Sequence, residues 1–336
     1  MEPYLSFVVA ARNDNYGGYF LHRMQIFING LMALREKHDL PAELIVVEWN
    51  PPVGNRRLID ALSWPRRASP GTISLVEVSG ELHRQLPNSD RMPMFEYIAK
   101  NVGIRHARGK FVLATNPDIL FSDELMKFFA NKQFSAACFY RVDRCDVAKI
   151  IPLTLPVSEQ LEFCRKYAYC IHQQSGSRPT SPMARLGLYL KHNTGRLTPA
   201  RVLRGIARRA KALSGQSDLP SASTALLPPV HANAAGDFIL MAKAQWHRLR
   251  GFPELKTHSH IDSFMCHLAS IAGVQQIISP HPIYHQEHER AEAAARPLTI
   301  LQDLDVFEKW RQTGQLENVN DESWGLANAC LPITQI

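Results

Sequence analysis

Residues 110–118 read Lys-Phe-Val-Leu-Ala-Thr-Asn-Pro-Asp, and this stretch decides the expected fold. Its short apolar run predicts a buried strand, and the polar residues that follow predict a turn stiffened by Pro117. In sheets built from alternating strands and helices, ligands bind just beyond the carboxyl ends of the strands. The stretch therefore predicts an α/β protein with a binding site near Asn116 and Asp118.

The segments on both sides of this stretch fit the same pattern. Residues 5–11, 43–49 and 73–78 are short, mainly apolar runs that predict strands, and residues 236–241 predict another. Apolar residues recur every three or four positions within residues 20–34 and 95–107, as one face of a helix requires. Alternating strands and helices predict a mixed, mainly parallel sheet with helices on both faces, which is a Rossmann-like α/β fold.

The composition is that of a soluble globular protein, with 45% hydrophobic and 21% charged residues among 336. No apolar run approaches the roughly 18 residues that cross a bilayer. The chain opens with Glu2 and Pro3 rather than with a basic and then an apolar stretch, so a cytoplasmic protein is expected. Its six cysteines form no C-x-x-C pair, which argues against a zinc ribbon or a secreted disulfide framework.

The net charge of +7 predicts a polyanionic partner, which could be nucleic acid, an anionic membrane face or a diphosphate. A basic stretch lies within residues 175–230, where serine- and proline-rich flanks predict a partly flexible insertion. Residues 199–213 place apolar side chains on one side and arginines and lysines on the other, as in a helix that lies on an anionic membrane surface. A solvated helix packed on the main domain explains this pattern equally well.

The expected organisation is a first half-domain at residues 1–174, the helical basic insertion at 175–230, and a second half-domain at 231–336 that ends in a helix. If 199–213 contacts lipid, the protein would be peripheral at the inner face of the membrane.

Two segments offer metal ligands. Asp118 presents a carboxylate on a stiff turn, which suits a hard cation such as Mg²⁺ or Mn²⁺ that also holds phosphate oxygens. In isolation, such a segment is more often a plain turn. The second segment contains His281, His285 and His288, whose imidazoles suit Mn²⁺ and other transition ions, although a surface loop rich in histidine is the simpler alternative.

Other polar residues have two interpretations each. Asp262 precedes an apolar helical pattern, so it either caps a helix or acts as a general base toward a hydroxyl. Polar and charged residues also follow the first predicted strand and close the second, where carboxylates could accept hydrogen bonds from a nucleobase and a ribose. Ordinary loop polarity explains them nearly as well; these residues are Arg12, Asn13, Asp14 and Glu48.

The order of these pieces resembles that of the family-2-like glycosyltransferases, whose GT-A fold is an α/β domain that binds a nucleotide sugar. The resemblance covers residues 5–140 and 231–290. Asn116-Pro117-Asp118 is similar to a variant of the family's Asp-x-Asp metal motif. The other similar segments are Arg12-Asn13-Asp14, Glu48, Asn101 and Gly103 with Ala107 and Gly109, Gly236-Asp237-Phe238, Trp246, Gly251-Phe252-Pro253-Glu254, Asp262 and His285 or His288.

This resemblance implies a role for each residue. A divalent metal, Mn²⁺ or Mg²⁺, is expected at Asp118 and His285, with His288 as the alternative histidine, and Asp262 is the expected catalytic base. The residues expected at the nucleotide sugar are Arg12, Asn13, Asp14, Glu48, Asn101 and Asn116. Those expected on the acceptor and sugar side are Gly236, Asp237, Trp246 and Glu254.

The implied activity is inverting transfer of a sugar from a UDP-, GDP- or dTDP-sugar to a hydroxyl of a glycan or a lipid-linked acceptor, in surface glycan biosynthesis. Two alternatives stay open. One is a metal-dependent phosphoesterase built around His281, His285 and His288; the other is a non-catalytic module that binds a surface glycan or an anionic lipid. Nucleic-acid binding is less attractive, because no aromatic residues interleave with the basic ones.

Overall fold

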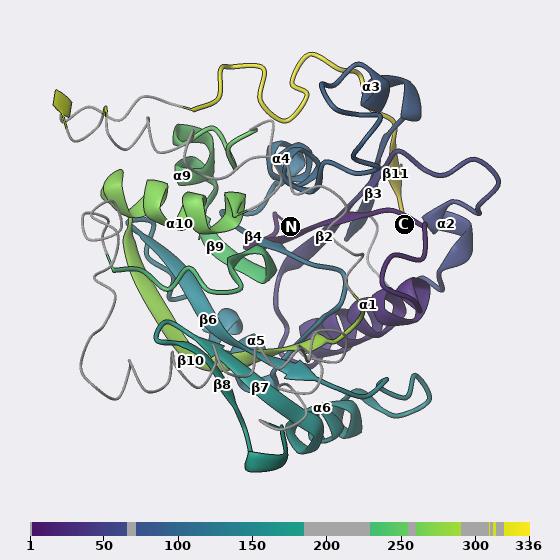
Figure 1. Cartoon of the computed structure of the whole chain (residues 1–336), viewed down its shortest axis with the longest axis vertical. Coiled ribbons are helices and arrows are strands. Elements are labelled where there is room, and N and C mark those ends of the chain that lie inside the picture. The colour runs from purple at the N-terminus through teal and green to yellow at the C-terminus, as the bar shows by residue number, and fades with distance from the viewer. Residues whose placement is uncertain are drawn as a thin grey trace, which may run out of the picture.

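The computed structural model describes residues 2–65, 72–184, 229–254, 260–289, 309, 312–313 and 319–336. These residues form a central sheet with helices on both faces (Figure 1). In sheet order the strands are β11 (Ile333–Gln335), β3 (Ile73–Val78), β2 (Ala42–Trp49), β1 (Leu5–Ala11), β4 (Phe111–Thr115), β9 (Phe238–Ala242), β6 (Cys138–Val147), β10 (Gln275–Gln286) and β5 (Ile119–Phe121). Strand β7 (Ala168–Gln173) pairs with β6, and β8 (Gly176–Pro179) pairs with β7.

The helices cover the two faces in separate groups. Helices α1 (Phe20–Lys37), α5 (Asp123–Ala130) and α6 (Val157–Tyr167) pack on one face, and α4 (Glu96–His106), α9 (Lys243–Arg248) and α10 (Ile261–Ile271) pack on the other. The short helices α2 (Leu58–Ala61) and α3 (Gly80–Arg84) follow β2 and β3, and a single 3-10 turn, η2 (Ala235–Asp237), leads into β9. None of the described helices is both long enough and apolar enough to span a bilayer.

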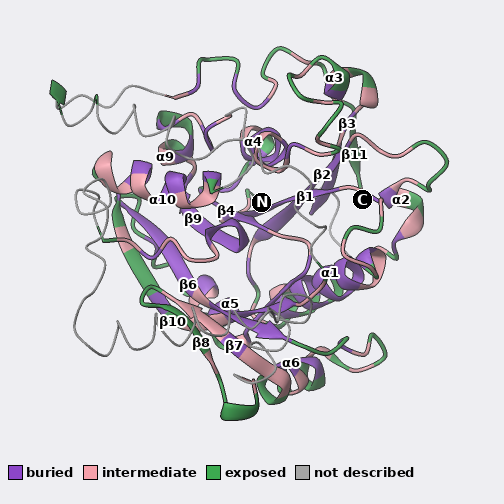
Figure 2. Cartoon of the chain, in the orientation of Figure 1, coloured by how far each residue is buried: buried purple, intermediate pink, exposed green. Residues whose placement is uncertain are grey.

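The apolar strands form because both faces of the sheet are covered. In β1, Phe7 and Val9 belong to the core under α1 and α5, whereas Val8 and Ala10 belong to the core under α4 and α10. A side chain of this size contributes about 1.5–3 kcal/mol when it is fully buried, so both faces favour the same uninterrupted apolar run. Figure 2 shows strands β2, β1, β4, β9 and β6 buried at the centre of the sheet, whereas β10 is exposed over part of its length.

The expected mixed sheet with helices on both faces is confirmed. Strands β3, β2, β1 and β4 are parallel, and β10 runs parallel to β6; the pairings of β11, β9, β5, β7 and β8 with their neighbours are antiparallel. The strands predicted at 5–11 and 73–78 are β1 and β3, and the two predicted helices are α1 and α4. The basic helix expected at 199–213 and most of the expected terminal helix lie outside the described residues.

The strand order interleaves the two expected half-domains. Strand β9, from the second half, lies between β4 and β6 of the first, and β10 lies between β6 and β5. Strand β8 belongs to the segment expected as an insertion, yet it extends the same sheet through β7. The described parts of all three segments are therefore joined by one sheet.

Sheet register brings distant residues to one edge. Parallel pairing sets Ala11 opposite Glu48 and Val9 opposite Thr115, so the loops after β1, β2 and β4 leave the same edge. Strand β9 starts there because it runs antiparallel to β4, with Phe238 opposite Thr115.

Candidate functional site

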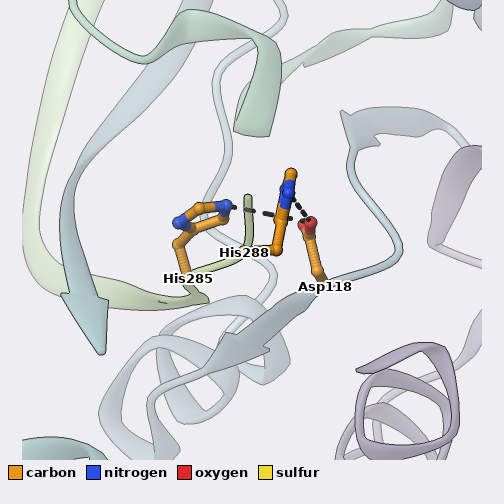
Figure 3. Close-up of side chains that lie close together, drawn as sticks. All are labelled: Asp118, His285 and His288. Carbon is orange, nitrogen blue, oxygen red and sulfur yellow. Dashed lines mark ion pairs between the residues drawn. The ribbon is translucent and has the colours of Figure 1, made fainter. Parts of the chain in front are cut away.

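At this edge, three side chains form a candidate metal centre. Asp118 lies between β4 and β5, His285 lies near the end of β10, and His288 follows that strand. His288 Nε2 is 3.2 Å and His285 Nε2 is 3.8 Å from Asp118 Oδ2 (Figure 3). One ligand atom from each residue can be chosen so that all three lie within 4.8 Å of one another. The expected metal-binding residues are thus brought together.

Asp118 has the features of a carboxylate that is set up for a cation. It is only 8% exposed, and its Oδ1 is buried with no hydrogen-bond partner among the described residues. Burial raises the pKa of this carboxyl, but His285, His288 and Arg23 outweigh that effect and lower it to about 2. A buried, ionised carboxylate oxygen without a partner is costly unless a ligand satisfies it. This oxygen therefore fits a cation.

Both histidines turn the same ring nitrogen towards Asp118. His285 Nδ1 lies 3.1 Å from Asp146 Oδ1, and His288 Nδ1 lies 2.9 Å from the carbonyl oxygen of Glu289. An acceptor at Nδ1 favours the tautomer with its hydrogen there, which leaves the Nε2 lone pair for a metal. Burial lowers the pKa of His285, but Asp118 and Asp146 outweigh it and raise the pKa above the ordinary value.

His281 is separate from this cluster. Its ring lies 6.1 Å from that of Phe128, and it is not among the described residues whose ligand atoms converge on Asp118. The geometry thus does not assemble the three-histidine centre on which the phosphoesterase alternative was based.

The loop after β1 forms a wall of the site. A Cβ added at Gly17 would lie 2.3 Å from His288 Nδ1, and the Tyr16 ring centroid is 5.4 Å from that of His288. The buried Arg23 holds this loop by donating to the carbonyl oxygens of Tyr16, at 2.7 Å, and of Gly18. Gln286 Nε2 in turn donates to the carbonyl oxygen of Arg23 at 2.9 Å.

Three of the residues expected at the nucleotide, Arg12, Asn13 and Asp14, lie in this loop. They connect it to the loop after β2. Arg12 pairs with Asp14 at 2.5 Å and donates from Nε to the carbonyl oxygen of Asn50 at 2.8 Å. Asn13 Nδ2 donates to the carbonyl oxygen of Arg56 at 2.8 Å. The loops after β1 and β2 are therefore joined beside the cluster.

Glu48 has a different environment from the one expected. It is fully buried, with Oε2 3.0 Å from Arg57 Nη2, and its Oε1 accepts a 2.9 Å hydrogen bond from the Leu58 backbone N–H. Both oxygens thus hold the start of α2.

A buried chain of polar side chains continues from the cluster. Asp146 lies beside His285 and 2.9 Å from Arg144 Nε, and Arg144 Nη1 lies 2.5 Å from Asp237 Oδ2. Asp237 Oδ1 accepts from Asn116 Nδ2 at 2.7 Å.

This chain of polar side chains ends at Lys100, which is fully buried. Its Nζ donates to Asn116 Oδ1 at 2.7 Å, to the Gly236 carbonyl oxygen at 2.9 Å and to Glu96 Oε1 at 2.7 Å. Because both ends of the Asn116 amide are engaged, Asn116 and Asp118 have separate roles in one turn.

Sequence reasoning missed Lys100, Arg144 and Asp146 of this polar chain, and also His172, whose Nε2 lies 2.8 Å from Asp146 Oδ2. A signal was present, because residues 138–147 carry four charged side chains in a strand where almost every position is buried. Charged residues are rarely buried unless they are paired, so such a strand predicts an internal ion network.

Three expected ligand-binding residues instead support the fold. Asn101 is fully buried, donates to the Phe252 carbonyl oxygen and to Glu254 Oε1, both at 2.8 Å, and accepts from the Phe252 N–H at 2.7 Å. Trp246 is also fully buried, and its indole N–H donates to the Val112 carbonyl oxygen at 3.0 Å. The geometry gives these residues, with Glu254, a packing and hydrogen-bonding role and does not bring them to the cluster.

Asp262 is not a helix cap. His260 occupies the position before α10, and Asp262 lies in its first turn, where Oδ2 accepts a 2.7 Å hydrogen bond from the Gly236 N–H. A Cβ at Gly236 would lie 3.1 Å from the Tyr97 hydroxyl and 3.4 Å from Asp262 Oδ2, so glycine permits this close approach. Asp262 thus adjoins η2, whose Asp237 belongs to the polar chain.

No protein-family model and no curated protein match this chain. Among solved structures, the crystal structure of S. aureus TarS 1–349 aligns with a TM-score of 0.39 at 14% identity, over 85% of this chain and 60% of that chain. Its complexes with UDP-GlcNAc and UDP align at TM-scores of 0.40 and 0.38 and identities of 12% and 13%, over 98% and 85% of this chain and 71% and 61% of those chains. This chain thus spans about 60% of the first of these structures, and a likeness of this degree says nothing about its activity.

Proposed function

We propose that this chain is a metal-dependent glycosyltransferase of the GT-A type, which moves a sugar from a nucleoside-diphosphate donor to a hydroxyl of a glycan or lipid-linked acceptor. The observation that carries the proposal is the cluster of Asp118, His285 and His288, in which the buried Asp118 Oδ1 has no hydrogen-bond partner among the described residues. It lies at the edge where the parallel strands β1 and β4 end, and α/β sheets bind their ligands there.

The donor set favours Mn²⁺ over Mg²⁺. Asp118 supplies carboxylate oxygen, which both ions accept, whereas the imidazoles of His285 and His288 suit transition ions. When bound, the cation would neutralise the negative charge that develops on the departing nucleoside diphosphate. The loop after β1 flanks this position, so its residues Arg12, Asn13 and Asp14 remain our candidates for the nucleotide side.

Asp262 is the proposed base. The Gly236 N–H holds Oδ2 and so fixes the carboxylate against η2. In the proposed step the acceptor oxygen bonds to the anomeric carbon, the acceptor proton goes to Asp262, and the bond to the diphosphate breaks with its electron pair on the leaving oxygen. Inversion at the anomeric carbon follows if this attack occurs in a single displacement.

The first experiment measures Mn²⁺ binding and nucleotide-sugar turnover in protein stripped of metal. Asp118→Asn and His285→Gln should lose Mn²⁺ binding and Mn²⁺-dependent turnover, because each removes a ligand. His281→Gln is the matched control, since it removes an imidazole from the same strand but outside the cluster. Turnover that chelation leaves unchanged would contradict the proposed metal dependence.

A second experiment separates the proposal from its alternatives. Asp262→Asn should abolish sugar transfer while Mn²⁺ and nucleotide binding persist, because the amide fills the same space without accepting a proton. Near wild-type transfer by this variant would remove Asp262 from the mechanism. Metal-dependent phosphate release from simple esters without an acceptor would favour a phosphoesterase, and the absence of metal-dependent heat with UDP-, GDP- and dTDP-sugars would favour a binding module.

A further inference from the structure

Strand β6 carries two carboxylates, Asp143 and Asp146, which are three positions apart and therefore point to opposite faces. Each is paired with a residue of β7: Gln173 Nε2 donates to Asp143 Oδ2 at 2.7 Å, and His172 Nε2 lies 2.8 Å from Asp146 Oδ2. Asp143 and Asp146 can therefore be compared directly, because they are carboxylates of the same strand that each pair with β7.

Each carboxylate also lies beside a histidine from outside β7, but only one of these histidines belongs to the candidate metal centre. Asp143 Oδ1 is 3.3 Å from His231 Nε2, on the far side of β6 from the cluster. Asp146 Oδ1 is 3.1 Å from Nδ1 of His285, the ring nitrogen that faces away from Asp118.

The contact between Asp146 and His285 is fixed by the sheet rather than by a loop. Parallel pairing of β6 with β10 sets the two residues directly opposite each other. Both are less than a tenth exposed. Arg144, whose Nε is 2.9 Å from Asp146 Oδ1, compensates the buried carboxylate charge and connects it to Asp237.

We propose that Asp146 is a positioning residue for the metal site: it accepts the Nδ1 hydrogen of His285 and so fixes the tautomer and ring orientation that turn Nε2 towards Asp118. This inference rests on the metal-dependent function proposed above. A carboxylate behind a ligating imidazole also increases the basicity of the ligand, and loss of such a partner typically weakens metal binding about 10- to 100-fold.

The test compares Mn²⁺ dissociation constants, measured by electron paramagnetic resonance titration, in metal-stripped wild type and three variants. Asp146→Ala should weaken binding about 10- to 100-fold. Asp146→Asn should weaken it less, because the amide oxygen still accepts from Nδ1. Asp143→Asn, the matched control on the other face, should bind Mn²⁺ as tightly as wild type.

A second readout is the tautomer of His285, which in wild type does not depend on how well the Asp146 variants fold. Nitrogen-15 NMR of wild-type protein, at a pH where the ring is neutral, should show the Nδ1–H tautomer for His285, assigned by the signals that disappear in His285→Gln. Asp146→Ala should shift this ring towards the Nε2–H tautomer. A role of Asp146 limited to balancing the charge of Arg144 would change the melting temperature but not the tautomer.

The outcomes separate the two proposals. Wild type that binds no Mn²⁺ overturns both the proposed function and this inference. Wild type that binds Mn²⁺, together with Asp146→Ala that binds it equally tightly, overturns only the inference. An Nε2–H tautomer of His285 in wild type also overturns it, whatever the variants do.

Discussion

Lys100→Met should destabilise the protein strongly, although it removes no apolar contact. Lys100 is fully buried, and its Nζ donates to Asn116 Oδ1, the Gly236 carbonyl oxygen and Glu96 Oε1. Methionine has a similar length and shape, so the substitution removes the donor group without opening a large cavity.

The size of the expected decrease in the free energy of unfolding follows from the hydrogen-bond acceptors that lose their donor. Asn116 Oδ1 and the Gly236 carbonyl oxygen each lose a charged donor, at about 1–3 kcal/mol each. Relief from burying an ammonium group offsets part of this loss, so we expect a net decrease of about 2–4 kcal/mol in the free energy of unfolding. Glu96 is 34% exposed, and the ion pair contributes at most about 1 kcal/mol, so Glu96→Gln should have a small effect.

The assay is urea denaturation followed by tryptophan fluorescence and circular dichroism, with coincident transitions as the test of two-state unfolding. Lys110→Met is the control, because Lys110 is exposed just before β4; it should stay within about 0.5 kcal/mol of wild type. The reasoning is refuted if Lys100→Met is as stable as Lys110→Met. Its Mn²⁺ affinity should match that of wild type, because the three side chains proposed to bind the metal, and Asp146 behind His285, are unchanged.

Three further predictions use other parts of the molecule. Gly103→Ala should lower the free energy of unfolding by about 1–3 kcal/mol in the same assay, because its Cβ would lie 2.4 Å from Val8 Cγ1 where α4 packs on β1. Burial and Arg141 lower the pKa of His231 from 6.5 to about 4. Between these two pH values the unfolded chain therefore binds a proton that the folded protein does not bind. The stability that neutral His231 contributes is therefore fully present above about pH 6.5 and is lost as the pH falls towards 4, by about 2 kcal/mol between pH 7 and pH 5. Denaturation of His231→Gln at pH 7 and at pH 5 should lack this pH-dependent loss of stability. Mn²⁺ at 100 times its dissociation constant should stabilise wild type by about 2.7 kcal/mol, measured by calorimetry, and should leave Asp118→Asn unchanged.

The sequence predicted best those elements whose buried faces show as a pattern of apolar residues within the element itself. The run at 5–11 is apolar at almost every position because both of its faces are covered, and it is strand β1 without any shift of its ends. Helix α1 likewise shows its buried face as a repeat of three and four positions, from Phe20 to Leu34. Such patterns need no knowledge of the partner element.

The partners of polar side chains could not be predicted in this way. Asp146 and His285 are 139 positions apart and meet only because β6 and β10 pair in parallel. Glu48 closes the second predicted strand and was expected at a nucleoside from the family resemblance; the chain turns back after this strand and places Arg57 and the Leu58 N–H on its two oxygens. Sheet register decides the first case and the path of the loop after β2 decides the second, and neither is visible in a local pattern.

In the turn at residues 116–118, long-range partners give the two polar residues Asn116 and Asp118 different roles. Asn116 Nδ2 donates to Asp237 Oδ1, and a carboxylate at this position could not make that bond. Aspartate at 116 would instead set a second negative charge within hydrogen-bond distance of Asp237, with Lys100 as its nearest compensating charge. The amide therefore joins Lys100 to Asp237 without adding charge, while Asp118, which faces His285 and His288, keeps one carboxylate oxygen with no hydrogen-bond partner in the described part of the chain. Asp237 therefore requires the amide at 116, and the proposed metal site depends on Asp118 and the two histidines.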